Sequence, residues 1–219
     1  MRSGTTASAL DAVTVDAMGT IVELADPAPG LRSALAERGV ERDLVEVAAA
    51  FRAEVEYYLP RTLEGRDEVT LADLGQRCTG VFLEHAGADL DAAEFAPAFL
   101  ASIVFEPLSG APAALARLRE AGLALACVSN WDVSLAGHLE RAGVAHFFTE
   151  IVSSAEIGAA KPDPAVFLAT LGRLGVTPER ALHVGDGESD REGAAAAGIA
   201  FEPAPLATLP ERLGLGRRP

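Results

Sequence analysis

Short apolar runs recur along the chain, and each has the length of one buried β-strand. Four runs are clear and a fifth is weaker: residues 12–18, 123–129, 150–154, 181–185 and 199–202. Stretches with the apolar spacing of a helix separate most of them, at residues 111–121, 135–142, 165–174 and 188–197. Strands that alternate with helices predict a parallel sheet covered by helices. With right-handed crossovers, this is a doubly wound, Rossmann-like α/β fold.

In residues 23–105 the alternation of strands and helices is interrupted, and no segment has a convincing strand pattern. Four segments carry helical apolar spacing, at residues 30–38, 43–58, 71–85 and 92–103. Pro60 ends the second segment, because proline cannot continue a helix. We therefore expect two domains. Residues 1–22 and 106–219 would form the α/β core, and residues 23–105 would be an inserted helical bundle that caps it.

Length and charge narrow the class of protein. A chain of 219 residues, 49% of them hydrophobic, suits one α/β core plus a small second domain. The formal net charge of -14 argues against nucleic acid as a partner, because phosphate backbones bind basic surfaces. A small anionic substrate stays compatible, since a site can be locally positive on an acidic protein.

The two cysteines and the apolar runs bear on the compartment. Cys78 and Cys127 have no metal-ligand spacing and form no disulfide framework, which favours a reduced, cytoplasmic setting. Cys127 is expected to be a small core residue. Residues 1–10 lack the apolar stretch of a signal peptide, and no run reaches the ~18 apolar residues of a membrane helix. The oligomeric state is left open.

Polar or charged residues follow each of the four clear strands. They are Asp16 with Gly19 and Thr20, then Ser129 with Asn130, then Lys161, and finally Asp186 with Asp190. In an open α/β sheet, ligands bind beyond the carboxyl ends of the strands, so we expect these groups to meet. Lys161 is the only lysine in the chain, and it precedes Pro162 and Pro164.

These segments, in this order, resemble the four motifs of haloacid dehalogenase-like hydrolases. The motifs are Asp-x-x-Gly-Thr, Ser-Asn, Lys-Pro-Asp-Pro and Gly-Asp-x-x-x-Asp. The resemblance covers nearly the whole chain, and the helical insert lies where that family carries its first type of cap. It implies Mg²⁺ as cofactor, an aspartyl nucleophile and, most often, phosphate ester substrates.

The resemblance also implies a role for each residue. Asp16 would be the nucleophile beside Lys161, while Ser129, the backbone amide of Asn130 and Thr20 would hold the substrate. Metal ligands would come from the carboxylates of Asp16 and Asp186, the backbone carbonyl of Met18 and, directly or through a further shell, Asp190. A cation is needed because two anions about 4 Å apart repel by roughly 4 kcal/mol at an effective dielectric near 20.

Met18 departs from the family pattern. Phosphatases of this family usually carry a second aspartate at this position, as general acid on the leaving group and base on water. Methionine transfers no proton, and general acid–base catalysis contributes about 10²–10⁴-fold. We therefore expect slow turnover of alkyl phosphates and a smaller penalty for good leaving groups, unless a cap residue supplies the acid.

Three other functions are alternatives to the phosphatase. A 2-haloacid dehalogenase would use the same aspartyl attack, now at carbon, and would release halide without a proton or Mg²⁺. The acidic pair Asp186 and Asp190 argues for a metal instead. A phosphonate hydrolase needs a cap lysine, and residues 23–105 contain none. A catalytically weak binding or regulatory protein is the third alternative, and Met18 motivates it.

Other polar residues have weaker signals. Trp131 and Asp132 are balanced between contact with substrate and local packing or capping. His183 lies inside an apolar strand and is interpreted as a packed core residue. Candidates for substrate contact from the predicted cap are Arg52, Tyr57, Tyr58, Arg61 and Arg66, against the simpler interpretation that they coat or pack the bundle.

Overall fold

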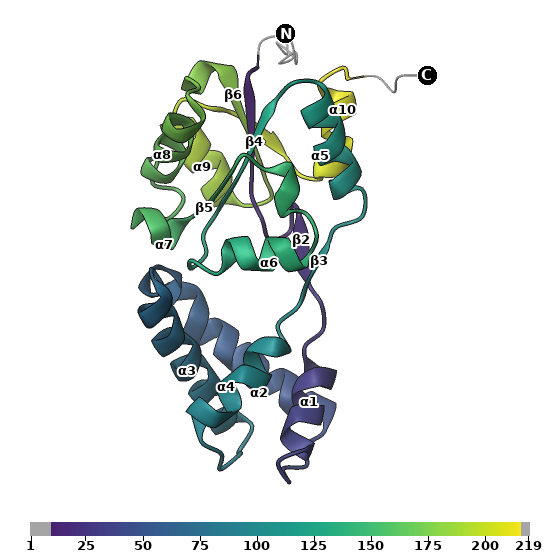
Figure 1. Cartoon of the computed structure of the whole chain (residues 1–219), viewed down its shortest axis with the longest axis vertical. Helices are drawn as coiled ribbons and strands as arrows, with labels where there is room; N and C mark the ends of the chain where they lie inside the picture. The colour runs from purple at the N-terminus through teal and green to yellow at the C-terminus, as the bar shows by residue number, and fades with distance from the viewer. Residues whose placement is uncertain (1–9, 216–219) are drawn as a thin grey trace.

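A computed structural model describes residues 10–215 of the chain. The α/β part and a bundle of helices are stacked along the long axis of the molecule (Figure 1). The predicted absence of a signal peptide concerns residues 1–9, which lie outside the described residues. The outer ends of the predicted core domain lie outside them as well.

The α/β part is built on a parallel sheet of five strands in the order β5-β4-β1-β6-β7. The strands are β1 (Ala12–Val15), β4 (Ala124–Ser129), β5 (Glu150–Ser153), β6 (Ala181–Gly185) and β7 (Ala200–Pro203). All four residues of β1 are buried, as expected for a central strand covered on both faces. The prediction of a doubly wound α/β fold is confirmed.

Helices cover both faces of this sheet. One face packs on α5 (Ala111–Glu120), α6 (Leu135–Arg141) and α10 (Leu209–Arg212), and the other on α8 (Ala165–Leu174) and α9 (Glu188–Ala196). Figure 1 shows α5 and α10 on the opposite side from α8 and α9. Because side chains alternate along a strand, Val13 and Val15 join the first core, and Thr14 faces the second layer.

The helical unit comprises α1 (Ala28–Ala36), α2 (Leu44–Tyr58), α3 (Glu68–His85) and α4 (Ala92–Ala101). It has its own hydrophobic core, in which the ring centroid of Phe99 lies 6.4 Å from that of Phe51 and 5.3 Å from that of Phe82. Side chains of Asp43 and Asp67 accept backbone N–H groups at the starts of α2 and α3, which satisfies donors that the helix leaves unpaired. All four predicted helices are present.

Short elements complete the chain. They are the helix α7 (Ser154–Ile157) and 3-10 turns at Leu59–Glu64, Ala145–Phe147, Pro178–Arg180 and Leu206–Thr208. As predicted, α2 ends just before Pro60. Within residues 10–215, no helix is both long and apolar enough to cross a membrane.

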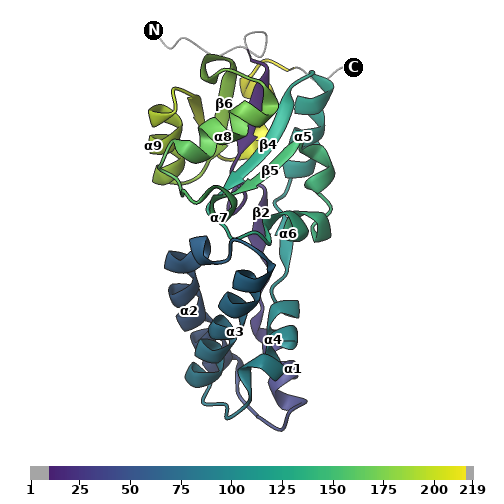
Figure 2. The same cartoon turned by 60° about the vertical axis from the view of Figure 1, so that its left-hand side comes forward.

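Two strands between the units were missed. The strands β2 (Val22–Leu24) and β3 (Phe105–Pro107) pair antiparallel where the chain enters and leaves the helical unit. Figure 2 places β2 at this junction. The prediction that residues 23–105 hold no strand is therefore wrong at both ends. Three residues are too few for a periodic signal, and the pairing joins segments far apart in the sequence.

A buried carboxyl lies inside the helical unit. Glu54 of α2 is 5% exposed and lies against Cys78 of α3. Burial raises the pKa of Glu54 to about 7 from 4.5, and the Cys78 thiol opposes this only in part. The folded chain therefore binds a proton here more tightly than the unfolded chain does.

This raised pKa predicts a stability that falls with pH. Between pH 4.5 and about 7 the unfolded chain releases the proton first, so the free energy of unfolding should decrease by up to about 3 kcal/mol. Glu54→Gln should remove this part of the dependence. Urea unfolding of both proteins between pH 4.5 and about 7 tests this prediction. If the free energy of unfolding falls equally with pH in both proteins, another group is responsible.

Candidate active site

The predicted residues meet at the carboxyl edge of the sheet. Asp16 follows β1, Ser129 ends β4 and Asp186 follows β6, while Lys161 comes from the loop between α7 and α8. Because these strands are parallel neighbours, their carboxyl ends lie at one edge. Polar residues that are far apart in the sequence therefore lie together in a single cluster.

Asp16 is held by two donors on one oxygen. The ammonium of Lys161 lies 2.5 Å from Asp16 Oδ1, and the Ser129 hydroxyl donates to the same oxygen at 2.9 Å. Asp16 and Lys161 are each 6% exposed. Both contacts are made by Oδ1. They fix the orientation of the carboxylate and leave Oδ2 free of these two donors.

The ammonium of Lys161 has its three donors used within the site. Besides Asp16, it donates to Asp190 Oδ1 at 2.5 Å and to the Val128 carbonyl at 3.2 Å. Burial works against the charged form, yet Asp16 and Asp190 together raise the pKa of Lys161. The lysine is therefore a fixed positive charge beside Asp16.

Asn130 positions the lysine through its side chain. Its Oδ1 accepts the backbone N–H of Lys161 at 2.7 Å, and its Nδ2 donates to the Lys161 carbonyl at 3.0 Å. The sequence suggested only a backbone contact with substrate for this residue. The two hydrogen bonds give Asn130 a second role, because they hold the backbone of Lys161 against the end of β4.

Three carboxylates form a candidate metal site. Oxygen atoms of Asp16, Asp186 and Asp190 all lie within 4.8 Å of one another. Burial and the negative charges of Asp16 and Asp190 raise the pKa of Asp186. Since Lys161 is the one ammonium in the cluster, two negative charges remain uncompensated. Hard oxygen donors with excess negative charge suit Mg²⁺.

Asp190 is more constrained than the other two carboxylates. Its Oδ1 contacts Lys161 at 2.5 Å and His183 Nε2 at 3.0 Å, and its Oδ2 accepts the Gly187 N–H at 3.1 Å. Despite burial, the hydrogen bond from His183 and the charge of Lys161 lower the pKa of Asp190 to about 2. With most acceptor positions filled, Asp190 has less to offer a cation than Asp16 and Asp186.

Two glycines make room for the carboxylates. A Cβ at Gly185 would collide with the Asp190 side chain, and one at Gly19 would collide with Asp186 Oδ2. Gly19 also has a φ of +72°, which L side chains rarely adopt. Met18, in the same turn, has a side chain that is 40% exposed.

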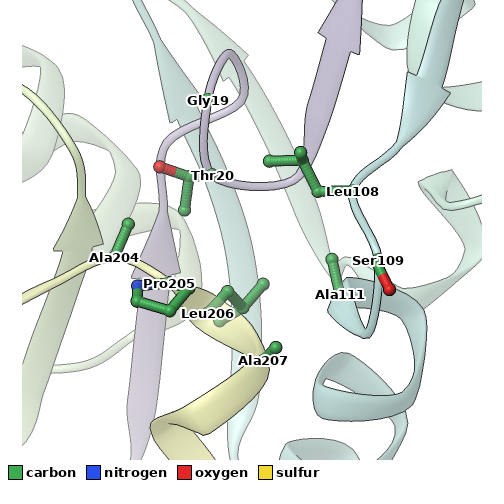
Figure 3. Close-up of a pocket in the computed structure, with 9 residues that line it drawn as sticks. All are labelled: Gly19, Thr20, Leu108, Ser109, Ala111, Ala204, Pro205, Leu206 and Ala207. Carbon is green, nitrogen blue, oxygen red and sulfur yellow. The ribbon is translucent and has the colours of Figure 1, made fainter.

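Thr20 is not bonded to this cluster. It is 2% exposed, and its hydroxyl has no hydrogen-bond partner among the described residues. With Gly19 it borders a pocket of about 410 Å³ whose other walls are mainly apolar, including Leu108, Pro205 and Leu206 (Figure 3). Its contact with substrate therefore stays a prediction.

His183 belongs to the hydrogen-bond network, which the sequence did not reveal. Its ring is fully buried, as expected of a core residue, but Nε2 meets Asp190 and Nδ1 lies 2.9 Å from the Thr14 hydroxyl. Burial lowers the pKa of His183 despite the Asp190 carboxylate. Its place near the end of an apolar strand, two residues before Gly185, was the available signal.

Side chains of the helical unit reach the core beside the site. The Tyr58 hydroxyl donates to Asp132 Oδ2 at 2.9 Å, and the Val133 N–H donates to the Gly65 carbonyl at 2.9 Å. Asp132 Oδ1 also accepts the Ser134 N–H at 2.8 Å. Asp132 therefore caps a local turn and anchors the helical unit to the loop that follows Ser129.

The other candidates from the predicted cap are less engaged with the core. Arg61 stacks on the Tyr57 ring, 3.8 Å from its centroid, and Tyr57 accepts a hydrogen bond from Arg77. Arg52 and Arg66 are exposed. Trp131 is buried, with its ring 4.9 Å from that of Phe105, which favours the packing interpretation.

Comparison with known proteins now decides the family. A sequence model described as haloacid dehalogenase-like hydrolase matches residues 10–198. The chain belongs to this family of hydrolytic enzymes. It is 32% identical over 192 residues to phosphoglycolate phosphatase of Cereibacter sphaeroides, covering 86% of this chain and 82% of that protein.

Shorter stretches match other phosphatases. The identity is 46% over 87 residues to glyceraldehyde 3-phosphate phosphatase of Methanopyrus kandleri, which is 39% of this chain and 37% of that protein. It is 42% over 119 residues to phosphoserine phosphatase of Thermus thermophilus, which is 53% and 48% respectively. The match thus spans less than half of each of these two relatives.

Solved structures agree on the fold. The defluorinating L-2-haloacid dehalogenase Rha0230 has a TM-score of 0.66 and 28% identity, with 88% of this chain and 80% of that chain covered. The putative HAD hydrolase YfnB from Bacillus subtilis has a TM-score of 0.70 at 19% identity, with 94% and 99% covered. The family thus includes both phosphatase and dehalogenase relatives of this chain.

The crowding at Gly19 predicts a specific loss of metal affinity. Gly19→Ala should weaken Mg²⁺ binding by about 10- to 100-fold, because the new methyl group displaces the Asp186 carboxylate. Isothermal titration calorimetry with Mg²⁺ measures this directly.

Gly39→Ala is the matched control. Gly39 has a similar φ of +78°, and its added Cβ meets nothing within 4 Å. Both variants should lose about 1 kcal/mol of stability from backbone strain. Equal Mg²⁺ affinities in the two variants would argue that Asp186 does not hold the ion.

Proposed function

We propose that this enzyme is a Mg²⁺-dependent phosphatase that acts on a small phosphorylated metabolite through an aspartyl-phosphate intermediate. The observation that carries the proposal is the fixed Asp16 carboxylate, which contacts the Lys161 ammonium at 2.5 Å and has an oxygen within 4.8 Å of an Asp186 oxygen. The excess negative charge of the carboxylates suits a metal ion. That ion and the buried Lys161 ammonium together would allow an anionic substrate to approach Asp16.

The residues of the chain divide the reaction between them. An oxygen of Asp16 attacks phosphorus, the new P–O bond forms, and the ester P–O bond to the leaving alcohol breaks. Lys161 offsets the negative charge that gathers in the transition state, and Ser129 with the Asn130 amide would donate to the phosphoryl oxygens. The leaving oxygen takes its proton from solvent water, because Met18 has none to give. A second water then attacks phosphorus and loses a proton to solvent, the P–O bond to Asp16 breaks, and phosphate and the free Asp16 carboxylate are released.

Magnesium would be held by Asp16 and Asp186, with the Met18 carbonyl as a further oxygen donor and Asp190 near it. When bound, it would supply positive charge that lets carboxylate and phosphate approach. The donor set fits this ion because the cluster consists of three carboxylates, and among residues 10–215 no histidine or cysteine belongs to it.

The helical unit would act as a cap, with the limits predicted at residues 23–105. Through Asp132 and Val133, Tyr58 and Gly65 hold it against the loop that follows Ser129. A substrate bound beside Asp16 would then meet both units. The phosphatase relatives support a small phosphorylated substrate, and the relative from Cereibacter sphaeroides, matched over 82% of its length, is named for phosphoglycolate.

A 2-haloacid dehalogenase is the second candidate. Met18 favours it, since a departing halide needs no proton, and the structural similarity to Rha0230 at 28% identity adds weight. The acidic cluster of three carboxylates favours the phosphatase, because displacement of halide at carbon creates no need for a divalent cation.

A substrate panel separates the two activities. We expect phosphate release from aryl or acyl phosphates with Mg²⁺, no release with EDTA, and a loss of more than about 10³-fold in Asp16→Asn. Asp73→Asn, on the surface of α3, is the control for loss of an aspartate. Halide release from a 2-haloacid that survives EDTA would reverse the assignment, and equal background rates in wild type and Asp16→Asn would favour a non-enzymatic role.

Position 18 should control the choice of leaving group. Met18→Asp should raise kcat for an alkyl phosphate by about 10- to 100-fold, because the new carboxyl can protonate the leaving oxygen. Turnover of an aryl phosphate should change little, and Met18→Asn, which transfers no proton, should show no gain. A decrease with both substrates would mean that the methionine serves another purpose.

A further inference from the structure

A buried polar pair lies behind the site, in the middle of the sheet. Thr14 of β1 and His183 of β6 are register partners in adjacent parallel strands, and both are fully buried. Their side chains point toward the layer of α8 and α9, where the His183 ring meets Phe167 edge-on with centroids 4.8 Å apart. Apolar side chains could fill the same space.

The hydrogen bonds of this pair run in one direction. An ionised Asp190 carboxylate only accepts, so His183 Nε2, 3.0 Å from Asp190 Oδ1, must carry a proton, and in a neutral ring this is the only proton on the two nitrogens. Nδ1 is then an acceptor, and the Thr14 hydroxyl at 2.9 Å supplies the donor. The Asp190 carboxylate therefore sets the tautomer, and the Thr14 hydroxyl supports it by donating to Nδ1, which is closer than its other acceptor, the Leu182 carbonyl at 3.4 Å.

The same oxygen of Asp190 holds the lysine. Oδ1 lies 2.5 Å from Lys161 Nζ, and that ammonium also lies 2.5 Å from Asp16 Oδ1. A rotation of the Asp190 carboxylate would move Oδ1 away and leave Lys161 with one carboxylate instead of two. The Gly187 N–H restrains Oδ2, while His183 restrains Oδ1 from the side of the sheet.

We propose that Thr14 and His183 form a positioning pair that fixes Asp190, and through Asp190 sets the lysine ammonium against the nucleophile Asp16. Neither residue touches the substrate. The catalytic consequence rests on the proposed phosphatase function, whereas the tautomer and the hydrogen-bond order do not. Burying two polar groups in a sheet is costly unless they are bonded to each other, which this arrangement achieves.

Nitrogen NMR of the full chain labelled with ¹⁵N-histidine tests the hydrogen-bond order without any substrate. The His183 signals are those that disappear in His183→Gln. We expect a neutral ring with the proton on Nε2 in wild type, and a mixture of tautomers or altered Nδ1 signal in Thr14→Val. A charged ring, the Nδ1–H tautomer, or no change in Thr14→Val would overturn the pairing.

Kinetics with the substrate found for the wild type test the positioning role. Thr14→Val should lower kcat by about 3- to 10-fold with KM unchanged, and Thr14→Ser should restore it. Thr170→Val is the matched control, because Thr170 is fully buried in α8, beside the same face of the sheet, and among the described residues its hydroxyl bonds only the Val166 carbonyl. If Thr170→Val lowers kcat equally, the effect is a general packing loss and the proposal fails.

The histidine itself provides the second comparison. His183→Leu should lower kcat by about 10- to 100-fold, and His183→Gln should retain more activity because its amide can still donate to Asp190. Equal rates in the two variants would contradict a role through that hydrogen bond. If no phosphatase activity is found in wild type, the proposed function fails, and the NMR result still decides the hydrogen-bond order.

Discussion

The ammonium of Lys161 lies between two carboxylates in a site where little of it meets water. Removing an ion from water costs several kcal/mol, and the cost is offset only when all its donors are bonded. Here Asp16, Asp190 and the Val128 carbonyl use the three donors of Lys161. The Lys161 ammonium and the Asp16 carboxylate therefore hold each other in place, and the other residues of the site surround this pair.

The fold builds this structure with few parts. Three adjacent parallel strands deliver Asp16, Ser129 and Asp186 to one edge, and the Asn130 amide pins the lysine backbone from the end of β4. Gly185 leaves the space that Asp190 fills. Because each part touches the next, a change in one carboxylate alters the environment of the others.

Much of this was predictable from local sequence. The strands, their alternation with helices and the order of the polar loop tips specify which groups gather, since parallel strands end at a common edge. Asp16, Ser129, Lys161, Asp186 and Asp190 are all brought into one region. The four helices of the helical unit followed from apolar spacing.

The remainder depends on contacts between distant segments. The strands β2 and β3 exist through their mutual pairing, and Thr14 became a partner of His183 because of the register of β1 against β6. The bond between Tyr58 and Asp132 needs the placement of two units. Hydrophobic pattern carries no information on such pairings, so these features could not be read from the chain alone.

Asp16 should become phosphorylated during turnover. Acid quenching of the wild-type enzyme in the steady state, followed by peptic digestion and mass spectrometry, tests this most directly. We expect a phosphoryl group on the peptide that contains Asp16, present with Mg²⁺ and absent in Asp16→Asn. An unmodified peptide, recovered while the enzyme is releasing phosphate at full rate and an acyl phosphate standard survives the quench, would contradict it.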